Sequence, residues 1–242
     1  RGIFRLTLFI EGAGTLLLCV RFVPEFGFVQ GAYYAIFHSV SAFCNAGFSL
    51  FSDSLVRYRF DPLVNVTVIS LVVLGGLGFL VLREIIDLFE KKGGPRQRIS
   101  LHSRLVLSTT IILLAGGAIL IAMIEQGTSL LGEAGWSKFW VASFQSVTAR
   151  TAGFNTIDLA LFEAPTLFLI MFLMFVGASP GSCGGGIKTT SLALFVAILT
   201  SRLKGCSHTN VFRRTVSNEA SAKVLSLVML AALLLGIALF IL

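Results

Sequence analysis

The sequence predicts an all-α membrane protein made of repeated units, each consisting of a membrane span, a re-entrant pore helix, a filter loop and a second span. Three observations lead to this prediction. Mean hydropathy is +0.89, and only 13% of the 242 residues are charged, whereas soluble domains carry about 25%. Several apolar segments approach the roughly 20 residues that a spanning helix needs. A short polar segment ending in Ala-Gly-Phe occurs twice, at residues 39–48 and 146–154.

Five apolar segments follow one another as predicted spans. They cover about residues 3–23, 62–88, 101–125, 165–203 and 222 onward. We expect Pro24 to end the first span, and Asp61-Pro62 is a favourable helix start for the second. The fourth segment is too long for one crossing and is interrupted at residues 177–186.

Two shorter apolar segments lie between these spans. Residues 30–43 separate the first span from the second, and residues 137–148 separate the third from the fourth. Segments of about 10 to 14 residues suit re-entrant half-helices and not full spans. Each is followed at once by an Ala-Gly-Phe loop, residues 45–48 and 151–154. The order of span, half-helix, loop and span therefore occurs twice.

These units divide the chain into four predicted parts. Residues 1–90 form one pore repeat, 91–100 a cytoplasmic connector, 101–204 another repeat with a broken last span, and 205–242 a connector and the first helix of a further repeat. Of 19 Lys and Arg residues, six lie within 83–104, five within 202–223 and two at positions 1 and 5. The positive-inside rule places these in the cytoplasm and both Ala-Gly-Phe loops outside. Because the chain starts on Arg1 and ends within an apolar run, we expect a piece of a longer protein.

The residues disfavour several other functions. The net charge of +7 does not indicate nucleic-acid binding, because Lys and Arg beside membrane spans are topology signals. The four cysteines lack the spacing of a zinc site or a disulfide framework. An intramembrane enzyme would need a base beside a nucleophile such as Ser182, and His38 is expected in the opposite leaflet. Ile187 follows Gly186 where a phosphate-binding loop requires Lys. No catalytic residue is predicted.

The Ala-Gly-Phe loops carry the predicted ion-binding chemistry. A selective cation pore needs backbone carbonyls that replace the hydration shell of the ion. Glycine adopts backbone angles that aim successive carbonyls at one axis, and a half-helix entering from outside directs its negative end at the pore. The predicted potassium selectivity filter comprises Asn45, Ala46, Gly47, Phe48, Thr151, Ala152, Gly153 and Phe154. The carbonyls of all but the two phenylalanines are the expected ion ligands. A loop at a helix contact, the alternative, does not account for two copies.

The interruption of the fourth span is a glycine-rich loop, residues 177–186. Proline removes a backbone donor and glycine weakens a helix strongly, so this loop is expected to obstruct the ion path and move aside; a passive kink is the alternative. The residues of the predicted gating loop are Gly177, Ser179, Pro180, Gly181, Ser182, Gly184, Gly185, Gly186 and Lys188. Arg150 lies in the second Ala-Gly-Phe segment, where a bare charge is costly. We expect it to brace the loop by donating to carbonyls.

Three motifs resemble the Trk/Ktr/HKT superfamily of potassium transporters. They are Asn45-Ala46-Gly47-Phe48, residues 148–156 and residues 179–190. They occur in the order of the superfamily, and the similarity spans nearly the whole chain. The resemblance implies four repeats around a pseudo-fourfold, potassium-channel-like pore. This chain would hold the second repeat, the third repeat and the first helix of the fourth. The resemblance also implies that Gly47 and Gly153 are the key filter glycines.

The resemblance further implies potassium uptake across the plasma membrane, the inner membrane in a bacterium, with K⁺ as the transported ion. A sodium-permeable or unselective cation transporter of the same fold stays open. In the plant branch a residue of the first repeat marks sodium preference, and that repeat is outside this chain. The implied partners are the lipid bilayer, a second copy in a homodimer, and a cytosolic ring of nucleotide-binding regulatory subunits facing residues 91–104 and 202–214. Cys44 and Cys183 depart from the residues usual in the superfamily.

Overall fold

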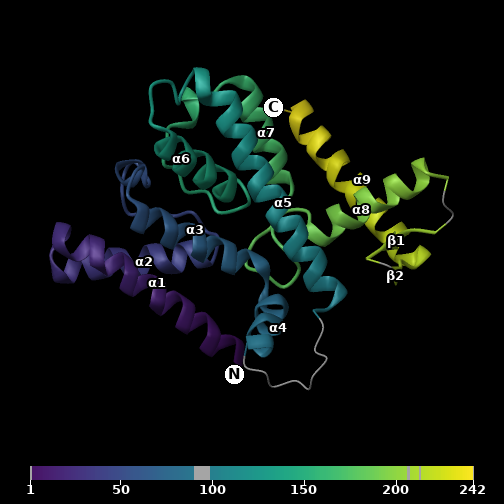
Figure 1. Ribbon diagram of the computed structural model, residues 1–242, viewed down its shortest axis with the longest axis horizontal. Coiled ribbons are helices and arrows are strands. Elements are labelled where there is room, and N and C mark those ends of the chain that lie inside the picture. The colour runs from purple at the N-terminus through teal and green to yellow at the C-terminus, as the bar shows by residue number, and fades with distance from the viewer. Residues whose placement is uncertain (1, 90–98, 206–207, 213, 242) are drawn as a thin grey trace.

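The computed structural model describes residues 2–89, 99–205, 208–212 and 214–241, and its fold is mainly helical (Figure 1). The first half contains α1 (Gly2–Phe26), α2 (Phe28–Phe43), the 3-10 turn η1 (Val56–Tyr58), α3 (Pro62–Leu77) and α4 (Phe79–Phe89). The second half contains α5 (Leu101–Ile124), η2 (Glu125–Gly127), α6 (Gly135–Thr148), η3 (Leu159–Leu161), α7 (Ala164–Phe175), α8 (Thr189–Leu203) and α9 (Asn218–Ile241). Between α8 and α9, strands β1 (Asn210–Val211) and β2 (Arg214–Thr215) pair antiparallel, which hydropathy does not predict.

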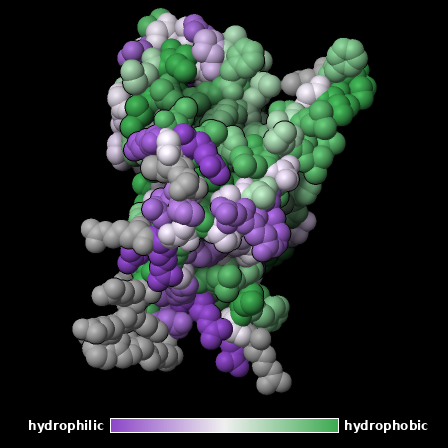
Figure 2. Space-filling model, turned by 90° about the vertical axis from the view of Figure 1, so that its right-hand side faces the viewer, coloured by the Kyte–Doolittle hydropathy of each residue, from purple (hydrophilic) through white to green (hydrophobic). Residues whose placement is uncertain are grey.

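Apolar helices give the fold its membrane character. The helices that are long and apolar enough to cross a membrane are Gly2–Phe26, Leu101–Gly127 and Asn218–Ala238, and α3 with α4 forms a bent fourth candidate. The shorter helices α7 and α8 are also apolar. Figure 2 shows apolar side chains over much of the upper part of one face, with hydrophilic side chains gathered below them. This distribution is typical of a multi-pass membrane protein.

The first helix does not end at Pro24, contrary to the prediction. α1 continues through Pro24, and the break comes at Gly27, whose φ is +80°. A proline in the last turn costs little beyond the missing N–H, whereas a left-handed residue ends a helix and favours glycine. The chain then reverses into α2, which packs closely on α1: a Cβ at Gly31 would lie 2.6 Å from the Phe22 carbonyl oxygen. The half-helix predicted over residues 30–43 lies within α2.

The second predicted span, residues 62–88, is not continuous either. α3 and α4 meet at Gly78, which has a φ of +86°, with a bend of 103° between them. Hydropathy conceals this bend because apolar residues continue on both sides. The predicted helix start is confirmed: the Asp61 carboxylate accepts hydrogen bonds from the N–H groups of Leu63 (3.0 Å) and Val64 (3.1 Å).

The second half follows the predicted order of elements more closely. The half-helix predicted over residues 137–148 lies within α6, and the long fourth segment is two helices, α7 and α8, separated by residues 176–188. The fifth segment starts at Asn218, earlier than predicted. Most of the predicted connector 91–100 lies outside the described residues. The division of the chain into repeats stays a prediction.

One apolar core joins the two halves of the chain. Phe22 of α1 packs with Phe51 and Tyr58 of the outer loop before α3, and the same core includes Phe154 of the second Ala-Gly-Phe loop. The ring centroids of Phe22 and Tyr58 are 5.2 Å apart, and the Phe154 ring lies 6.4 Å from that of His38 on α2. The core therefore holds the second Ala-Gly-Phe loop against the first pore helix.

Candidate functional site

The two Ala-Gly-Phe loops have the same backbone pattern. Asn45 and Gly47 in the first loop have φ values of +52° and +70°, and Thr151 and Gly153 in the second have +73° and +91°. Positive φ is uncommon for asparagine and rare for a β-branched residue such as threonine. In each loop an alanine with ordinary φ lies between the two left-handed residues. The two loops therefore depart from extended backbone in the same way, at equivalent positions.

A hydroxyl group at the end of each pore helix fixes the loop that follows. Ser41 Oγ donates to the Phe48 carbonyl at 2.8 Å, and Thr148 Oγ1 donates to the Phe154 carbonyl at 2.7 Å. The same two residues also accept backbone hydrogen bonds from the loops, from the Ala46 N–H (2.9 Å) and the Gly153 N–H (3.2 Å). The carbonyls of Phe48 and Phe154 therefore point back to their helices.

The other six loop carbonyls are differently placed. Within the described part of the chain, no hydrogen bond is formed to the carbonyl oxygens of Asn45, Ala46, Gly47, Thr151, Ala152 or Gly153. A cleft of about 420 Å³ is lined by residues of both loops, including Ala46, Thr151 and Gly153. Carbonyls without a protein donor beside an open cleft are suited to bind a cation.

The two loops touch at their glycines, although about 100 residues separate them in the sequence. A Cβ at Gly47 would overlap the Ala152 carbonyl oxygen and lie 2.9 Å from the Gly153 Cα. A Cβ at Gly153 would lie 3.5 Å from the Gly47 Cα. Glycine is required at position 47 by both space and backbone angle. The structure thus brings Gly47 of the first loop against Ala152 and Gly153 of the second, whereas Phe48 is 70% exposed and Phe154 is fully buried.

Each pore helix is seated on the first helix of its own half in the same way. Ser39 Oγ donates to the Glu11 carbonyl at 2.7 Å, and Ser146 Oγ donates to the Leu114 carbonyl at 2.8 Å. One turn further along each first helix lies a glycine, Gly14 or Gly117, where a Cβ would collide with that serine hydroxyl. The glycines permit the two helices of each half to approach closely, and the serine hydrogen bonds determine how close they come.

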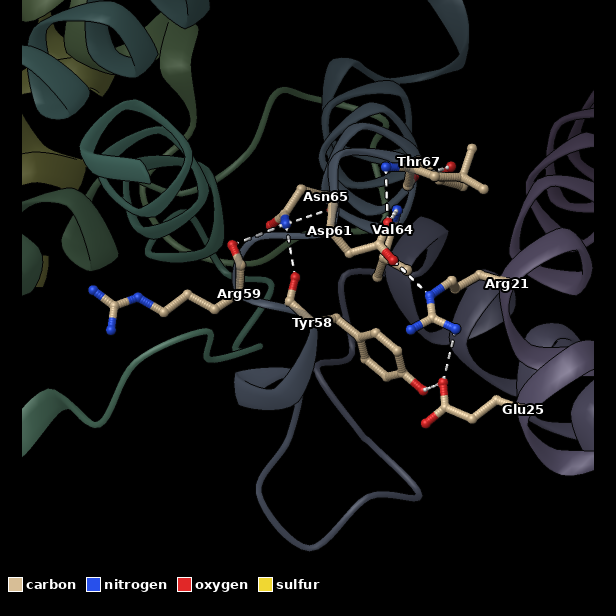
Figure 3. Close-up of polar contacts among 9 residues, drawn as sticks. Arg21, Glu25, Tyr58, Arg59, Asp61, Val64, Asn65 and Thr67 are labelled. Carbon is tan, nitrogen blue, oxygen red and sulfur yellow. Dashed lines mark hydrogen bonds and ion pairs between the residues drawn. The ribbon is translucent and has the colours of Figure 1, made fainter. Parts of the chain in front are cut away.

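A polar network positions the loop between α2 and α3 (Figure 3). Asp61 Oδ2 accepts from Arg21 Nε at 2.7 Å, and the Tyr58 hydroxyl donates to Glu25 at 3.0 Å. The Asn65 amide donates to the carbonyls of Tyr58 (2.9 Å), Arg59 (3.1 Å) and Asp61 (2.7 Å). Burial, and secondarily the bond to Glu25, raises the pKa of Tyr58 above its usual value. The Asp61 carboxylate thus forms both a helix cap and an ion pair.

Hydrogen bonds also tie this outer loop to the second Ala-Gly-Phe loop. The Leu55 N–H donates to the Asn155 carbonyl at 2.9 Å, and the Asn155 N–H donates to Ser54 Oγ at 3.1 Å. An ion pair of 3.5 Å joins Arg59 to Glu133 on the segment before α6. The outer ends of both halves therefore form one connected surface.

The glycine-rich loop is bound to the bend between α3 and α4. The N–H groups of Ser179 and Cys183 donate to the carbonyls of Gly76 (3.0 Å) and Gly75 (3.2 Å), and the Phe79 N–H donates to the Gly181 carbonyl (3.2 Å). The loop closes on itself where Ala178 N–H donates to the Gly185 carbonyl (3.1 Å) and Lys188 Nζ to the Gly184 carbonyl (2.8 Å). At Gly78 a Cβ would lie 2.6 Å from the Pro180 carbonyl oxygen, so the bend and the loop fit together.

The same loop lies against the first residues of both Ala-Gly-Phe loops. A Cβ at Gly184 would lie 2.5 Å from Thr151 Oγ1 and 3.3 Å from the Asn45 side-chain amide. Arg150 Nη2 donates to the Gly177 carbonyl at 3.2 Å. Arg150 therefore does donate to a carbonyl, but to one in the glycine-rich loop and not in its own segment.

Some residues of this site were not predicted from the sequence. Ser41 and Thr148, whose hydroxyls hold the two loops and which we call the clamp residues, occupy equivalent positions in the two copies of the repeated segment. The alignment of the copies could therefore have identified them. Gly75, Gly76 and Gly78 stand close together inside an apolar span, which is a weaker signal for a helix break. Nothing in the sequence pairs them with the glycine-rich loop.

Comparisons with known proteins show the family of this chain. The family model described as "TrkH: Cation transport protein" matches residues 6–242. Ktr system potassium uptake protein B of Vibrio alginolyticus is 37% identical over 100% of this chain and 53% of its own length. Potassium/sodium uptake protein NtpJ of Enterococcus hirae is 38% identical over 93% of this chain and 49% of its own. The chain thus spans about half the length of these relatives.

A solved structure shows the same fold. The potassium transporter TrkH from Vibrio parahaemolyticus superimposes with a TM-score of 0.73 at 19% identity, over 92% of this chain and 47% of that one. The predictions of an all-α membrane fold and of the Trk/Ktr superfamily are confirmed, and the matching family is described as one of cation transport proteins and not of enzymes.

Proposed function

This chain belongs to the TrkH family of cation transport proteins, and on that premise we propose that it forms part of a pore for potassium uptake. The observation that carries the proposal is the meeting of two loops with the same left-handed backbone pattern at Gly47 and Gly153. Relatives named as potassium uptake proteins support the choice of ion.

In the proposed mechanism, backbone carbonyls replace the water around K⁺ as it enters from outside. The carbonyls of Asn45, Ala46 and Gly47 supply one side of the filter, and those of Thr151, Ala152 and Gly153 supply the next. The hydroxyl clamps of Ser41 and Thr148 hold the loops in shape while the ion passes. No covalent step occurs, and the ion moves inward down its electrochemical gradient.

We propose that the glycine-rich loop is the gate of this pore. The proximity of Gly184 to Thr151 and Asn45, the first residues of the two proposed filter loops, supports this proposal. Shortening residues 181–186 should raise flux, because the loop would no longer reach its seat at Gly75 and Gly76. Unchanged flux in a folded variant would make the loop a passive kink.

The proposed partners are a second copy of the protein in a homodimer and a cytosolic ring of nucleotide-binding regulatory subunits. The basic segments at 91–104 and 202–214 would face that ring. Lipid contact is the other role that these charges support.

A second candidate is a sodium-permeable or unselective cation pathway in the same fold. The observation that favours it is the 38% identity to a relative named as a potassium/sodium uptake protein. The two candidates share the pore and differ in selectivity alone.

The deciding experiment is ⁸⁶Rb⁺ uptake into proteoliposomes carrying the complete protein, with K⁺ or Na⁺ as competitor. Competition by K⁺ and not by Na⁺ at the same concentration supports a potassium filter. Loss of this preference in Gly153→Ser would support a role of the second loop in selectivity. Equal competition by both ions favours the second candidate. Absence of uptake by a folded protein would refute both.

A further inference from the structure

Arg150 is a buried positive charge at the junction of three functional segments. It follows α6 directly at the inner end of the second Ala-Gly-Phe loop, and it is only 7% exposed. Its guanidinium stays charged at any relevant pH. Among the residues that the structure describes, no carboxylate forms an ion pair with it. A buried charge without a partner is costly, so other groups must stabilise it.

Two helix ends supply part of that stabilisation. Arg150 lies just beyond the C-terminus of α6, and its acceptor Gly177 lies just beyond the C-terminus of α7. The carbonyl ends of helices carry partial negative charge that favours a cation. The single guanidinium thus joins the ends of two helices and connects the second Ala-Gly-Phe loop to the glycine-rich loop.

A small cavity lies next to Arg150. Its volume is about 20 Å³, and its lining includes Asn45, Thr110, Arg150 and Ala178. In the described part of the chain, Arg150 Nε and Thr110 Oγ1 are buried polar atoms that lack a hydrogen-bond partner. A cavity of this size holds one water molecule, which needs two to four polar partners. The Arg150 N–H, the Thr110 hydroxyl and the Asn45 amide are suitable partners for one water.

We propose that Arg150, together with one water molecule bound in this cavity, is a latch that holds the glycine-rich loop closed against both Ala-Gly-Phe loops. The inference rests on the proposed function for its flux readout alone. When the loop moves away, the guanidinium loses the Gly177 carbonyl and the water loses Ala178 as a wall of its cavity. The closed arrangement is favoured over the open one by these interactions, which are stronger than the neutral backbone bonds at Gly75 and Gly76.

The latch is tested by the accessibility of the loop, which needs no transport. Ser179 is fully buried in the closed loop, so a thiol introduced by Ser179→Cys reports opening. The background is the complete protein in liposomes with its native cysteines replaced by serine or alanine. The rate of modification by a water-soluble methanethiosulfonate is measured beside ⁸⁶Rb⁺ uptake and its competition by K⁺ and Na⁺.

Arg150→Met should raise both the modification rate and the ⁸⁶Rb⁺ uptake by roughly tenfold, because loss of a charge-assisted hydrogen bond shifts the equilibrium between closed and open loop by about that factor. The preference for K⁺ should be retained. Thr110→Val removes one partner of the water and should raise both roughly twofold to fivefold. Arg150→Lys keeps the charge and one donor, so it should fall between wild type and Arg150→Met. Arg83→Met, on an exposed arginine of α4, is the matched control and should change neither quantity.

Three outcomes would overturn or separate the proposals. An unchanged modification rate in both Arg150→Met and Thr110→Val refutes the latch. A loss of K⁺ preference without faster modification makes Arg150 a brace of the filter, which also refutes it. Faster modification in a protein that shows no Rb⁺ uptake supports the latch and refutes the proposed pore. If Arg150→Met does not fold, Arg150→Lys and Thr110→Val decide.

Discussion

Replacing Thr148 by valine removes the hydroxyl that holds the second loop of the proposed filter, and it leaves the shape of the side chain nearly unchanged. Thr148 Oγ1 donates to the Phe154 carbonyl at 2.7 Å, and both residues are buried. A buried carbonyl left without its donor costs about 1–3 kcal/mol. The Phe154 carbonyl is expected to turn away in search of another donor and to disturb the left-handed residues Thr151 and Gly153 next to it.

The effect of Thr148→Val should appear in ion selectivity before it appears in stability. If the full cost is expressed in the preference for K⁺ over Na⁺, the preference falls by about 5- to 150-fold; part of it will be absorbed by relaxation, so we expect about tenfold. The assay is competition of ⁸⁶Rb⁺ uptake by K⁺ and by Na⁺. Thr148→Ser keeps the hydroxyl and is the control, and Ser41→Ala tests the equivalent clamp in the first loop. A folded Thr148→Val protein with unchanged preference would refute the reasoning that the clamp shapes the filter.

Three further predictions concern packing and the outer network. Gly75→Ala places a Cβ where the Phe43 carbonyl oxygen lies, so it should lower the unfolding temperature in detergent. Gly116→Ala is the control, because Gly116 has open space around it, and it should leave the unfolding temperature unchanged. Equal effects of the two substitutions would contradict the close contact at Gly75. Asn65→Leu removes the amide that donates three hydrogen bonds and should cost about 2–4 kcal/mol, from about 1 kcal/mol for each. The cost is read as a lower unfolding temperature than that of the wild type, and an unchanged unfolding temperature would contradict it. Because the folded pKa of Tyr58 is raised, its contribution to stability is complete below its ordinary value near 10 and is lost as pH rises above it. The unfolding temperature should therefore fall less steeply above that pH in Tyr58→Phe, and parallel pH profiles would exclude this role.

The sequence predicts the order of elements because each depends on local properties. Hydropathy and length distinguish the long helices α1, α5 and α9 from the shorter pore helices α2 and α6. The aligned repeats predict the Ala-Gly-Phe loops, since an unusual polar segment that occurs twice between apolar spans indicates a shared structural role. These signals need no knowledge of which segments touch.

The breaks between helices are harder to predict because they depend on tertiary partners. Gly27, and not Pro24, separates α1 from α2, because the tight reversal requires a positive φ that proline does not provide. The bend at Gly78 arises in a continuous apolar run and is fixed by the glycine-rich loop about 100 residues later. Likewise, the sequence predicts that Arg150 donates to a backbone carbonyl, but it does not predict which one. The acceptor, Gly177, is distant in the sequence and is a neighbour of Arg150 only in three dimensions.

The bend at Gly78 and the glycine-rich loop satisfy each other's backbone groups at membrane depth. A helix that ends leaves its last carbonyls unpaired, and a helix that begins leaves its first N–H groups unpaired. Here the carbonyls of Gly75 and Gly76 accept from the loop, and the Phe79 N–H donates to it. In a bilayer each such group left unpaired costs several kcal/mol unless water reaches it. The loop can therefore leave this seat only into a water-filled space, and opening of the proposed gate must be coupled to hydration of the backbone groups that it uncovers at Gly75, Gly76 and Phe79.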